Sequence, residues 1–201
     1  MTDTALIIFT RNPELGKCKT RLAKTLGDAA ALNIYKHLLK HTRDEAIKVA
    51  SDCYVFYSEE IIKDDMWSEG RFTKKLQIGR ALGVRMKNAF SELFDLGYKK
   101  VSIIGSDLLD LNHHIIQKSF EILEDHDVVI GPAKDGGYYL LALKQLPKRI
   151  FENKQWGTDS VLRETLKDLQ EFNVHLLKEL NDIDTFKDMQ YYNELKPYYT
   201  T

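Results

Sequence analysis

Short apolar runs alternate with segments of helical periodicity along almost all of the 201 residues. Six runs are brief and apolar enough to predict buried strands, and they span residues 5–9, 53–57, 100–105, 127–131, 137–143 and 173–177. Between them, apolar residues recur at three- and four-residue steps, which predicts amphipathic helices over residues 28–50, 86–97 and 112–123, and after residue 158. This strand–helix alternation predicts parallel strands with helices on both faces, which is an α/β fold of three layers.

Local signals indicate where several of these elements begin and end. Asn112 and Thr158 are expected to cap the helices that follow them, and Gly97 is expected just past the end of its helix. A last helical segment is expected from Thr185, whereas residues 59–80 have the least regular pattern and predict a surface excursion. No internal repeat, low-complexity tract or linker interrupts the chain, so residues 1–201 are expected to form one domain.

Charge and composition exclude several classes of protein. The 29 basic and 30 acidic residues give a net charge of −1, so no global field favours binding of nucleic acid or an anionic membrane. The first residues lack the basic region of a signal peptide, and no stretch is long enough to span a bilayer. With two cysteines, Cys18 and Cys53, and no CxxC pair, we expect reduced thiols and a cytoplasmic location. The cations around Cys18 are expected to favour its thiolate, although no nearby histidine is placed as a base for a nucleophile.

The loop after the first predicted strand, "TRNPELGKCKTRL" (residues 10–22), gathers positive charge in a chain that is nearly neutral. Its cations include Arg11, Lys17, Lys19 and Arg21. Several cations that converge in a cleft hold a polyphosphate where a single cation does not. The alternative is a solvated basic loop that leads into a helix. The glycine-rich loop of P-loop nucleoside triphosphatases is excluded, because its pattern requires other residues at the positions of Arg11 and Cys18.

Two acidic stretches fit a divalent cation. Asp107 comes directly after the predicted strand 100–105, where open α/β sheets bind ligands, and carboxylates are typical ligands of Mg²⁺. Asp110 is a weaker candidate, because it stands close to the next predicted helix. Asp182 and Asp184 share a face if the chain there is extended, and one of them is a candidate second metal ligand. The alternatives are a turn or cap role for Asp107 and a helix cap at Asp184.

The stretch "GPAKDGGYYLLAL" (residues 131–143) has two interpretations. Asp135, Gly136 and Gly137 read as a tight turn between two strands, which accounts for both glycines. Paired glycines also let the backbone approach a ligand closely, with Asp135 beside it.

Taken together and in this order, these stretches resemble one family, the radical-SAM/selenodomain-associated transferase 1 group, some members of which are labelled glycosyltransferases. The resemblance covers almost the whole chain, and its most specific part is "KTRL" combined with "GPAKDGGYYL". It also runs through "FTRNPELGKCKTRLA", "QIGRALGVRM", "IIGSDLLDL", "WGTDSVLRET" and "DIDTFKD". The family is similar to nucleotide-diphospho-sugar transferases of the GT-A type, and more distantly to phospholactate guanylyltransferases and sugar cytidylyltransferases. The resemblance implies a mainly parallel, Rossmann-like mixed sheet.

The resemblance also implies a role for each matching residue. Phosphates and the rest of the nucleotide would meet Arg11, Lys17, Lys19, Thr20, Arg21, Gln77, Gly79 and Arg85. The acceptor would meet Asp135, Gly136, Gly137, Tyr138, Trp156 and Thr158. Mg²⁺, or Mn²⁺, would be held by Asp107 and Asp184, and the catalytic residues would be Lys19, Arg21, Asp107 and Asp135. One departure is Leu109, because relatives usually carry proline at that position.

These features predict a Mg²⁺-dependent transferase that acts on a nucleotide. A nucleotidyltransferase, which joins a nucleoside triphosphate to a small phosphorylated or hydroxyl acceptor and releases pyrophosphate, is narrowly favoured because the extra phosphate needs extra counter-charge. A glycosyltransferase with a nucleotide-sugar donor is the alternative, and a non-catalytic nucleotide-binding regulator is a third. The nucleobase, the acceptor, the oligomeric state and the role of the tyrosine-rich C-terminal segment stay open.

Overall fold

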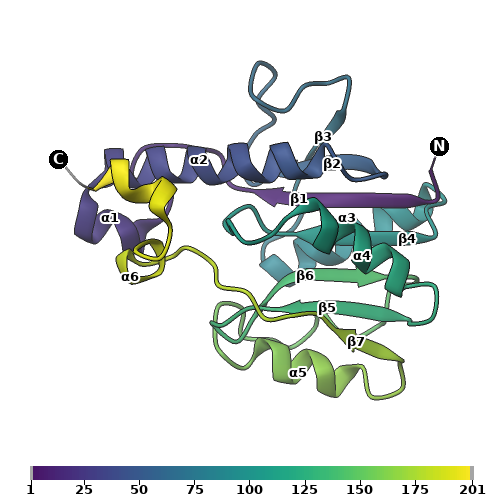
Figure 1. Cartoon of the computed structure of the whole chain (residues 1–201). Helices are drawn as coiled ribbons and strands as arrows, with labels where there is room; N and C mark the ends of the chain where they lie inside the picture. Colours follow the sequence, from purple (N-terminus) through teal and green to yellow (C-terminus); the bar gives the residue numbers. More distant parts are fainter. Residues whose placement is uncertain (1, 200–201) are drawn as a thin grey trace.

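The computed structural model describes residues 2–199, and its strands form one sheet (Figure 1). Within these residues the sheet has seven strands in the order β3-β2-β1-β4-β6-β5-β7. The strands are β1 (Thr4–Thr10), β2 (Asp52–Tyr57), β3 (Phe72–Leu76), β4 (Lys100–Ile104), β5 (Val128–Pro132), β6 (Tyr138–Leu143) and β7 (Val174–Leu176). The helices are α1 (Thr20–Leu26), α2 (Asp28–Ala46), α3 (Leu82–Asp95), α4 (His113–Ile122), α5 (Val161–Asp168), α6 (Phe186–Met189) and the 3₁₀ helix η1 (Asn193–Tyr198).

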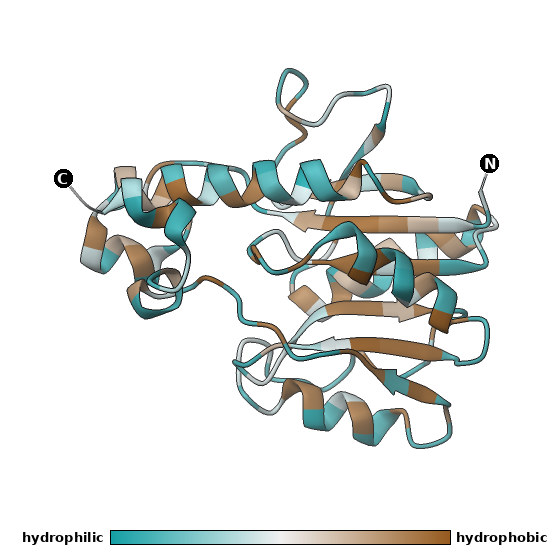
Figure 2. Ribbon diagram, in the orientation of Figure 1, coloured by the Kyte–Doolittle hydropathy of each residue, from teal (hydrophilic) through white to brown (hydrophobic). Residues whose placement is uncertain are grey.

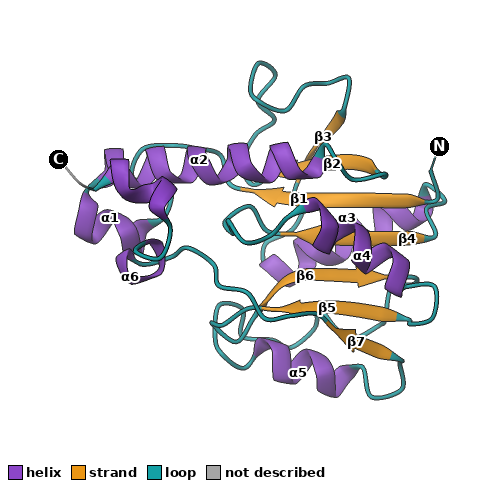
Figure 3. Cartoon of the chain, in the orientation of Figure 1, coloured by secondary structure: helices purple, strands orange, loops and turns teal. Residues whose placement is uncertain are grey.

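The sheet is mixed and mainly parallel, as expected. Strands β3, β2, β1 and β4 run parallel to one another, and β7 runs parallel to β5. Strand β6 lies between β4 and β5 and is antiparallel to both. The Asp135–Gly137 turn joins β5 to β6, which confirms the interpretation of these residues as a turn between two strands. The carboxyl ends of β1 to β4 therefore share one edge of the sheet (Figure 3).

Alternation along the central strands builds an apolar layer on each face of the sheet. In β1, Leu6 and Ile8 face α2 and α4, whereas Ala5 and Ile7 face α3 and α5. All four side chains are fully buried, as expected for a strand covered on both faces. Figure 2 shows the continuous apolar colouring of these strands and the mixed colouring of the covering helices. The three-layer arrangement predicted from the alternation of strands and helices is confirmed.

A third apolar cluster fastens the C-terminal segment to the first two helices. Leu22 of α1, Ile34 of α2, Ile183, Met189 of α6 and Leu195 of η1 are all completely buried there. Much of the tyrosine-rich tail packs against this cluster, through Tyr192, Tyr198 and Tyr199. The exception is Tyr191, which is 78% exposed. In Figure 1 this assembly lies beside the strand ends that carry the basic loop.

Several element boundaries differ from the sequence-based expectations. Residues 59–80 contain the edge strand β3, which the irregular pattern did not predict. The short helix α1 was also not predicted. Thr158 is not the cap of α5, because Ser160 holds that position and the Thr158 hydroxyl donates to the carbonyl of Gln155 at 2.8 Å. The expected cap at Asn112 is confirmed by a 3.1 Å bond from the amide of Ile115, and Gly97 follows α3 with a φ of 94°.

Glu45 at the end of α2 secures the beginning of α4. Its carboxylate accepts from the His113 amide at 2.8 Å and lies 2.7 Å from the His113 ring. Burial opposes the charge, but hydrogen bonds from Lys48 and His113 outweigh it and lower the pKa of Glu45 to about 2. Since this pKa lies below its ordinary value, the contribution to stability is complete above about pH 4.5 and is lost as the pH falls towards 2.

Glu45→Gln is therefore expected to lower the free energy of unfolding by about 1 kcal/mol near neutral pH. The difference from wild type is expected to shrink on acidification, which urea unfolding at several pH values measures. Glu121→Gln is the control, because its ion pair with Lys118 is exposed and spans 3.3 Å on the surface of α4. If the difference in the free energy of unfolding between wild type and Glu45→Gln stays constant down to acid pH, the stabilising role of the Glu45 charge is wrong.

No helix within residues 2–199 is both long enough and apolar enough to cross a membrane.

Candidate active site

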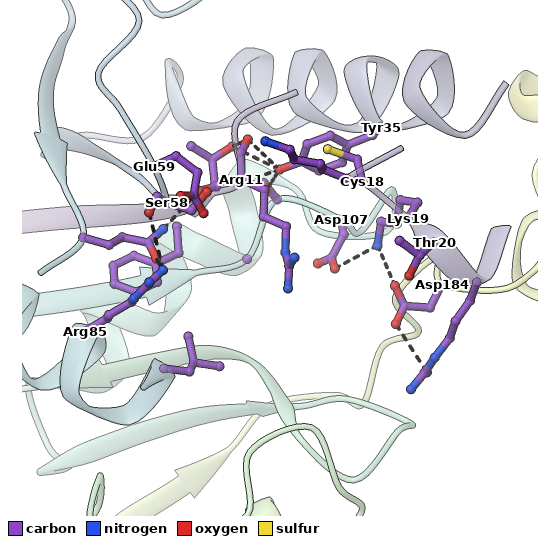
Figure 4. Close-up of a pocket in the computed structure, with 18 of the residues that line it drawn as sticks. Arg11, Cys18, Lys19, Thr20, Tyr35, Ser58, Glu59, Arg85, Asp107 and Asp184 are labelled. Atoms are coloured by element: carbon purple, nitrogen blue, oxygen red, sulfur yellow. Dashed lines mark hydrogen bonds and ion pairs between the residues drawn. The ribbon is translucent and has the colours of Figure 1, made fainter. Parts of the chain in front are cut away.

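A cavity of about 570 Å³ opens at the carboxyl ends of β1 to β4 (Figure 4). The loops after the parallel strands build it, since open α/β sheets leave this edge free for ligands. Residues from the basic loop, from the β2 and β3 ends and from the β4 loop meet there. The polar and charged lining residues include Thr10, Arg11, Lys17, Lys19, Thr20, Arg21, Tyr35, Ser58, Glu59, Gln77, Arg80, Arg85, Ser106, Asp107 and Asp184.

Lys19 bridges the two carboxylates that were proposed as metal ligands. Its Nζ donates to Asp107 Oδ2 at 3.0 Å and to Asp184 Oδ1 at 2.7 Å. The lysine side chain is only 6% exposed, whereas the two aspartates are about one-third exposed. Burial alone would lower the pKa of Lys19, but the charges of Asp107 and Asp184 outweigh it and raise the pKa above its ordinary value. The bridging ammonium is therefore charged.

The backbone of Lys19 explains why this side chain points inward. Lys19 has φ 47° and ψ 48°, which is left-handed, and it immediately precedes α1. A residue with a Cβ pays about 1–2 kcal/mol for this conformation, and such strain persists only where the surroundings determine it. The Lys19 carbonyl accepts the first bond of α1, from the Ala23 amide at 2.9 Å. The two ion pairs of its ammonium are the interactions that offset the strain.

Three carboxylates form a group that fits a divalent cation. Asp107, Asp182 and Asp184 each offer one oxygen, and these atoms all lie within 4.8 Å of one another. The Ile183 amide donates to the Asp107 carbonyl at 3.0 Å, which holds the two loops together. Carboxylate oxygens are the ligands that Mg²⁺ prefers, so the chemistry of this group fits such an ion. The Lys19 ammonium already lies between oxygens of two of these residues, Asp107 and Asp184.

The carboxyl of Asp182 has a raised pKa. Burial raises its pKa to about 6, and the nearby charges of Asp107, Asp135 and Asp184 act in the same direction. Asp182 was considered from the sequence but was not assigned to the metal. Its two-residue spacing from Asp184 is the signal that points to it.

The remaining cations of the basic loop differ in how they face the cavity. Figure 4 shows the guanidinium of Arg11 extending into it between Arg85 and Asp107. Arg21 is 66% exposed, and its Nη1 lies 3.6 Å from Asp184 Oδ2. Lys17 lines the rim but is 68% exposed and pairs with Glu14 at 2.6 Å. Lys19 is therefore the most enclosed of these four cations, whereas Arg11, Arg21 and Lys17 are exposed, with the Arg11 side chain directed into the cavity.

The other end of the cavity is built around Gln77 and Arg85. The Gln77 amide donates to the carbonyls of Thr10 at 3.0 Å and Phe56 at 2.8 Å, so it ties the ends of β1 and β2 together. Arg85 Nε donates to the Gly79 carbonyl at 2.9 Å. Gly79 adopts φ 137°, and a Cβ added at this position would lie only 2.8 Å from the Val84 side chain, so the turn requires glycine. Of this set, Gln77 and Arg85 line the cavity.

Two residues of the site change or extend the sequence-based picture. The Tyr35 hydroxyl accepts from the Arg11 amide at 2.8 Å, so α2 positions the start of the basic loop, a role its helical periodicity alone did not reveal.

Cys18 is buried, and its thiol donates to the Asn12 carbonyl at 3.2 Å. Burial raises the pKa of Cys18. The expectation of a favoured thiolate is therefore wrong, because desolvation outweighs the neighbouring cations.

The residues expected to meet the acceptor lie outside the lining of this cavity. Asp135 accepts from the Gly137 amide at 2.8 Å, and its charge reaches Asp182. Gly136 lies so close to the Asp159 backbone that a Cβ would approach it to 2.4 Å. Tyr138 and Trp156 form an edge-to-face aromatic pair with centroids 6.4 Å apart. Of this set, Asp135 is the residue whose charge helps to raise the pKa of Asp182.

Comparison with known proteins supports the fold. A family model described as "Uncharacterized protein conserved in bacteria (DUF2064)" matches residues 36–158. A 2-phospho-L-lactate guanylyltransferase from Methanocaldococcus sp. (strain FS406-22) is 27% identical over 146 residues. That match covers 71% of this chain and 60% of the relative, so the chain spans about three-fifths of the length of the curated relative.

Solved structures share the fold of this chain. A protein from Desulfovibrio desulfuricans G20, provisionally described as a nucleotide-diphospho-sugar transferase, superposes with a TM-score of 0.84 and 31% identity. The superposition covers 92% of this chain and 84% of that one. A 4-diphosphocytidyl-2C-methyl-D-erythritol synthase from Anaerococcus prevotii shares the fold at a TM-score of 0.62 and 14% identity, over 95% and 96% of the two chains. A Mycobacterium tuberculosis H37Rv protein solved with manganese shares it at 0.52 and 12%, over 94% and 96%.

Proposed function

This chain belongs to the DUF2064 family, and we propose that it is a nucleotidyltransferase. Its substrates are a nucleoside triphosphate and a small acceptor that carries a phosphate or hydroxyl group. The acceptor oxygen bonds to the α-phosphorus, the bond between that phosphorus and the bridging oxygen breaks, and pyrophosphate leaves. The guanylyltransferase activity named for the curated relatives supports this reaction class.

The observation that carries the proposal is the meeting of charges at one edge of the sheet. Lys19 from the first loop touches Asp107 from the middle of the chain and Asp184 from its last part. Arg11 and Arg21 line the same cavity. A solvated basic loop, which was the alternative interpretation of residues 10–22, would not place a buried lysine between two carboxylates.

The chain's own residues supply binding and charge stabilisation. Arg11, Lys19 and Arg21 hold the phosphates and neutralise the charge that develops on the leaving pyrophosphate. Their number suits a triphosphate, and Lys17 at the rim adds long-range attraction. Thr20 lines the same wall and offers a hydroxyl donor near the start of α1.

Asp107, Asp182 and Asp184 would hold Mg²⁺ or Mn²⁺. The group is made of carboxylate oxygens, which both ions prefer. When bound, such an ion screens phosphate charge and orients the reacting oxygens. Manganese in the related fold from Mycobacterium tuberculosis is in keeping with a divalent ion here.

We propose that one end of the site binds the nucleotide and that the other end binds the acceptor. The base and ribose are proposed to bind near Gln77 and Arg85, which line the cavity, with Gly79 in the turn whose carbonyl accepts from Arg85. Figure 4 shows Arg85 at the end of the site away from Asp107. The acceptor is proposed to approach from the turn at Asp135, Gly136 and Gly137, because the charge of Asp135 acts on Asp182, one of the three grouped carboxylates. Tyr138, which directly follows that turn, is proposed to contact the acceptor together with Trp156 and Thr158.

A glycosyltransferase that uses a nucleotide-sugar is the second candidate. The specific support is the description of the Desulfovibrio desulfuricans protein, which is the structure with 31% identity to this chain. A nucleotide-sugar carries one phosphate fewer than a triphosphate. The inward charge of Arg11 and Lys19, together with Arg21, favours the triphosphate.

A thermal-shift panel with and without Mg²⁺ separates the two reactions. We expect a Mg²⁺-dependent shift with a nucleoside triphosphate, and the name of the curated relatives favours GTP over CTP, ATP and UTP. A ligand at 100 times its Kd stabilises by about 2.7 kcal/mol, or roughly 5–10 °C for a chain of this size. UDP-glucose and GDP-mannose are the competing probes, and a shift confined to them supports glycosyl transfer. A panel without any shift contradicts both reactions.

A further inference from the structure

Lys19 contacts two of the three carboxylates that would hold a divalent cation. Its ammonium lies 3.0 Å from Asp107 Oδ2 and 2.7 Å from Asp184 Oδ1, and these carboxylates belong to the group whose oxygens lie within 4.8 Å of one another. The side chain is 6% exposed, so it is enclosed by the site and does not sample the surface. An ammonium and a metal ion cannot both bond to the same carboxylate lone pairs at these distances.

The backbone shows that this position is specifically built. Among the non-glycine residues of the described chain, positive φ occurs at Lys19 and Asn153. The left-handed turn at Lys19 sends its side chain inward, whereas Lys17 and Arg21 on either side are 68% and 66% exposed. The same turn begins α1, so the direction of the Lys19 side chain and the start of the helix are coupled.

We propose that Lys19 is a tethered placeholder cation, which neutralises Asp107 and Asp184 until metal and nucleotide bind and then moves onto the phosphates. The movement of Lys19 onto the phosphates rests on the proposed function, whereas its contacts with Asp107 and Asp184 do not. The lysine stem has several rotatable bonds, and Lys19 and Arg11 line the same cavity. The ammonium can therefore exchange one anion for another by rotation of its side chain.

Competition between Lys19 and the metal has a definite consequence for binding order. A tethered group competes at a high effective concentration, so metal alone binds weakly to the resting protein. Nucleotide phosphates offer Lys19 another anionic partner, which releases the carboxylates. Metal and nucleotide then strengthen each other's binding, and this coupling is reciprocal.

The test measures the binding of Mn²⁺ alone, by the electron paramagnetic resonance signal of the free ion. Lys19→Met is expected to bind Mn²⁺ about tenfold more tightly than wild type, since the variant lacks the competing charge. Arg21→Met is the matched control. It removes one cation of the same loop, but its guanidinium lies 3.6 Å from Asp184 and does not bridge the carboxylates, so we expect a change of less than about threefold. An unchanged or weaker Mn²⁺ affinity in Lys19→Met overturns the proposal.

A second measurement avoids the substitution, in case the variant does not fold. In wild-type protein labelled with ¹⁵N-lysine, the buried Lys19 ammonium is expected to give a signal protected from solvent exchange. Added Mg²⁺ is expected to shift or remove that signal, and its persistence without change at saturating Mg²⁺ overturns the proposal.

Neither measurement contains a nucleotide. If nucleotidyl transfer is not found but Lys19→Met binds Mn²⁺ more tightly, only the proposed function is wrong. If the Mn²⁺ affinity does not increase, the placeholder role of Lys19 is wrong whatever the reaction is.

Discussion

Replacing Asp107 with asparagine is expected to lower the rate of nucleotidyl transfer by about 10²- to 10³-fold, because one charged ligand of the carboxylate group is lost. The amide keeps the shape of the side chain, and its oxygen can still accept from Lys19, which lies 3.0 Å from Asp107 Oδ2. The melting temperature is therefore expected to stay close to that of wild type. Pyrophosphate release across a range of Mg²⁺ concentrations measures the effect.

Asp110→Asn is the matched control for this prediction. Asp110 lies in the same loop, is exposed, and accepts from the Tyr192 hydroxyl at 2.7 Å. We expect it to retain close to wild-type turnover and an unchanged Mg²⁺ dependence. If Asp107→Asn retains full turnover with Mg²⁺, the assignment of Asp107 as a metal ligand is wrong. If both variants lose activity equally, the shape of the loop matters and the charge does not.

Replacing Arg11 and Arg21 together with alanine is expected to weaken nucleotide binding by about 10²-fold. Among residues 2–199 no carboxylate forms an ion pair with the Arg11 side chain, which extends into the cavity (Figure 4). Arg21 is 66% exposed, and its guanidinium lies 3.6 Å from a carboxylate oxygen of Asp184. Opposite charges about 4 Å apart attract by roughly 1 kcal/mol in water and 4 kcal/mol at a shielded surface, so two partly solvated pairs account for the expected loss.

Salt dependence and a control variant separate this effect from a general loss of charge. The difference in Kd between wild type and the double variant is expected to be largest at low ionic strength, because salt screens exposed charges. Lys24→Ala removes a cation from α1 that does not line the cavity and is expected to leave the Kd nearly unchanged. Equal nucleotide affinity in wild type and the double variant would mean that residues 10–22 are a solvated basic loop and do not bind phosphate.

The central strands were predictable because each is a local pattern. Residues 5–9 and 100–105 are apolar runs that no solvated segment would carry, and both became buried parallel strands. The cap at Asn112 and the turn at Asp135 were predictable for the same reason, since the atoms involved lie within three residues of each other.

The failures share a different cause. Strand β3 contains Lys74 and Lys75, and its place at the edge of the sheet lets both lysines reach partners, Asp65 at 3.0 Å and Glu92 at 2.8 Å. Charged edge strands carry little apolar signal. The thiol of Cys18 was misjudged because neighbours in the chain are visible in the sequence but burial is not.

The types and positions of the charged residues were visible in the residue order, which was enough to predict a basic loop, candidate carboxylates and the sheet edge where they belong. Their meeting was not visible, because Lys19 is 88 residues from Asp107 and 165 from Asp184 along the chain. Only packing of the C-terminal segment against α1 and α2 brings Asp184 to that lysine. Periodicity reports which face of an element is apolar, whereas contacts across such separations depend on how whole layers pack, and the inward turn of Lys19 is a product of that packing.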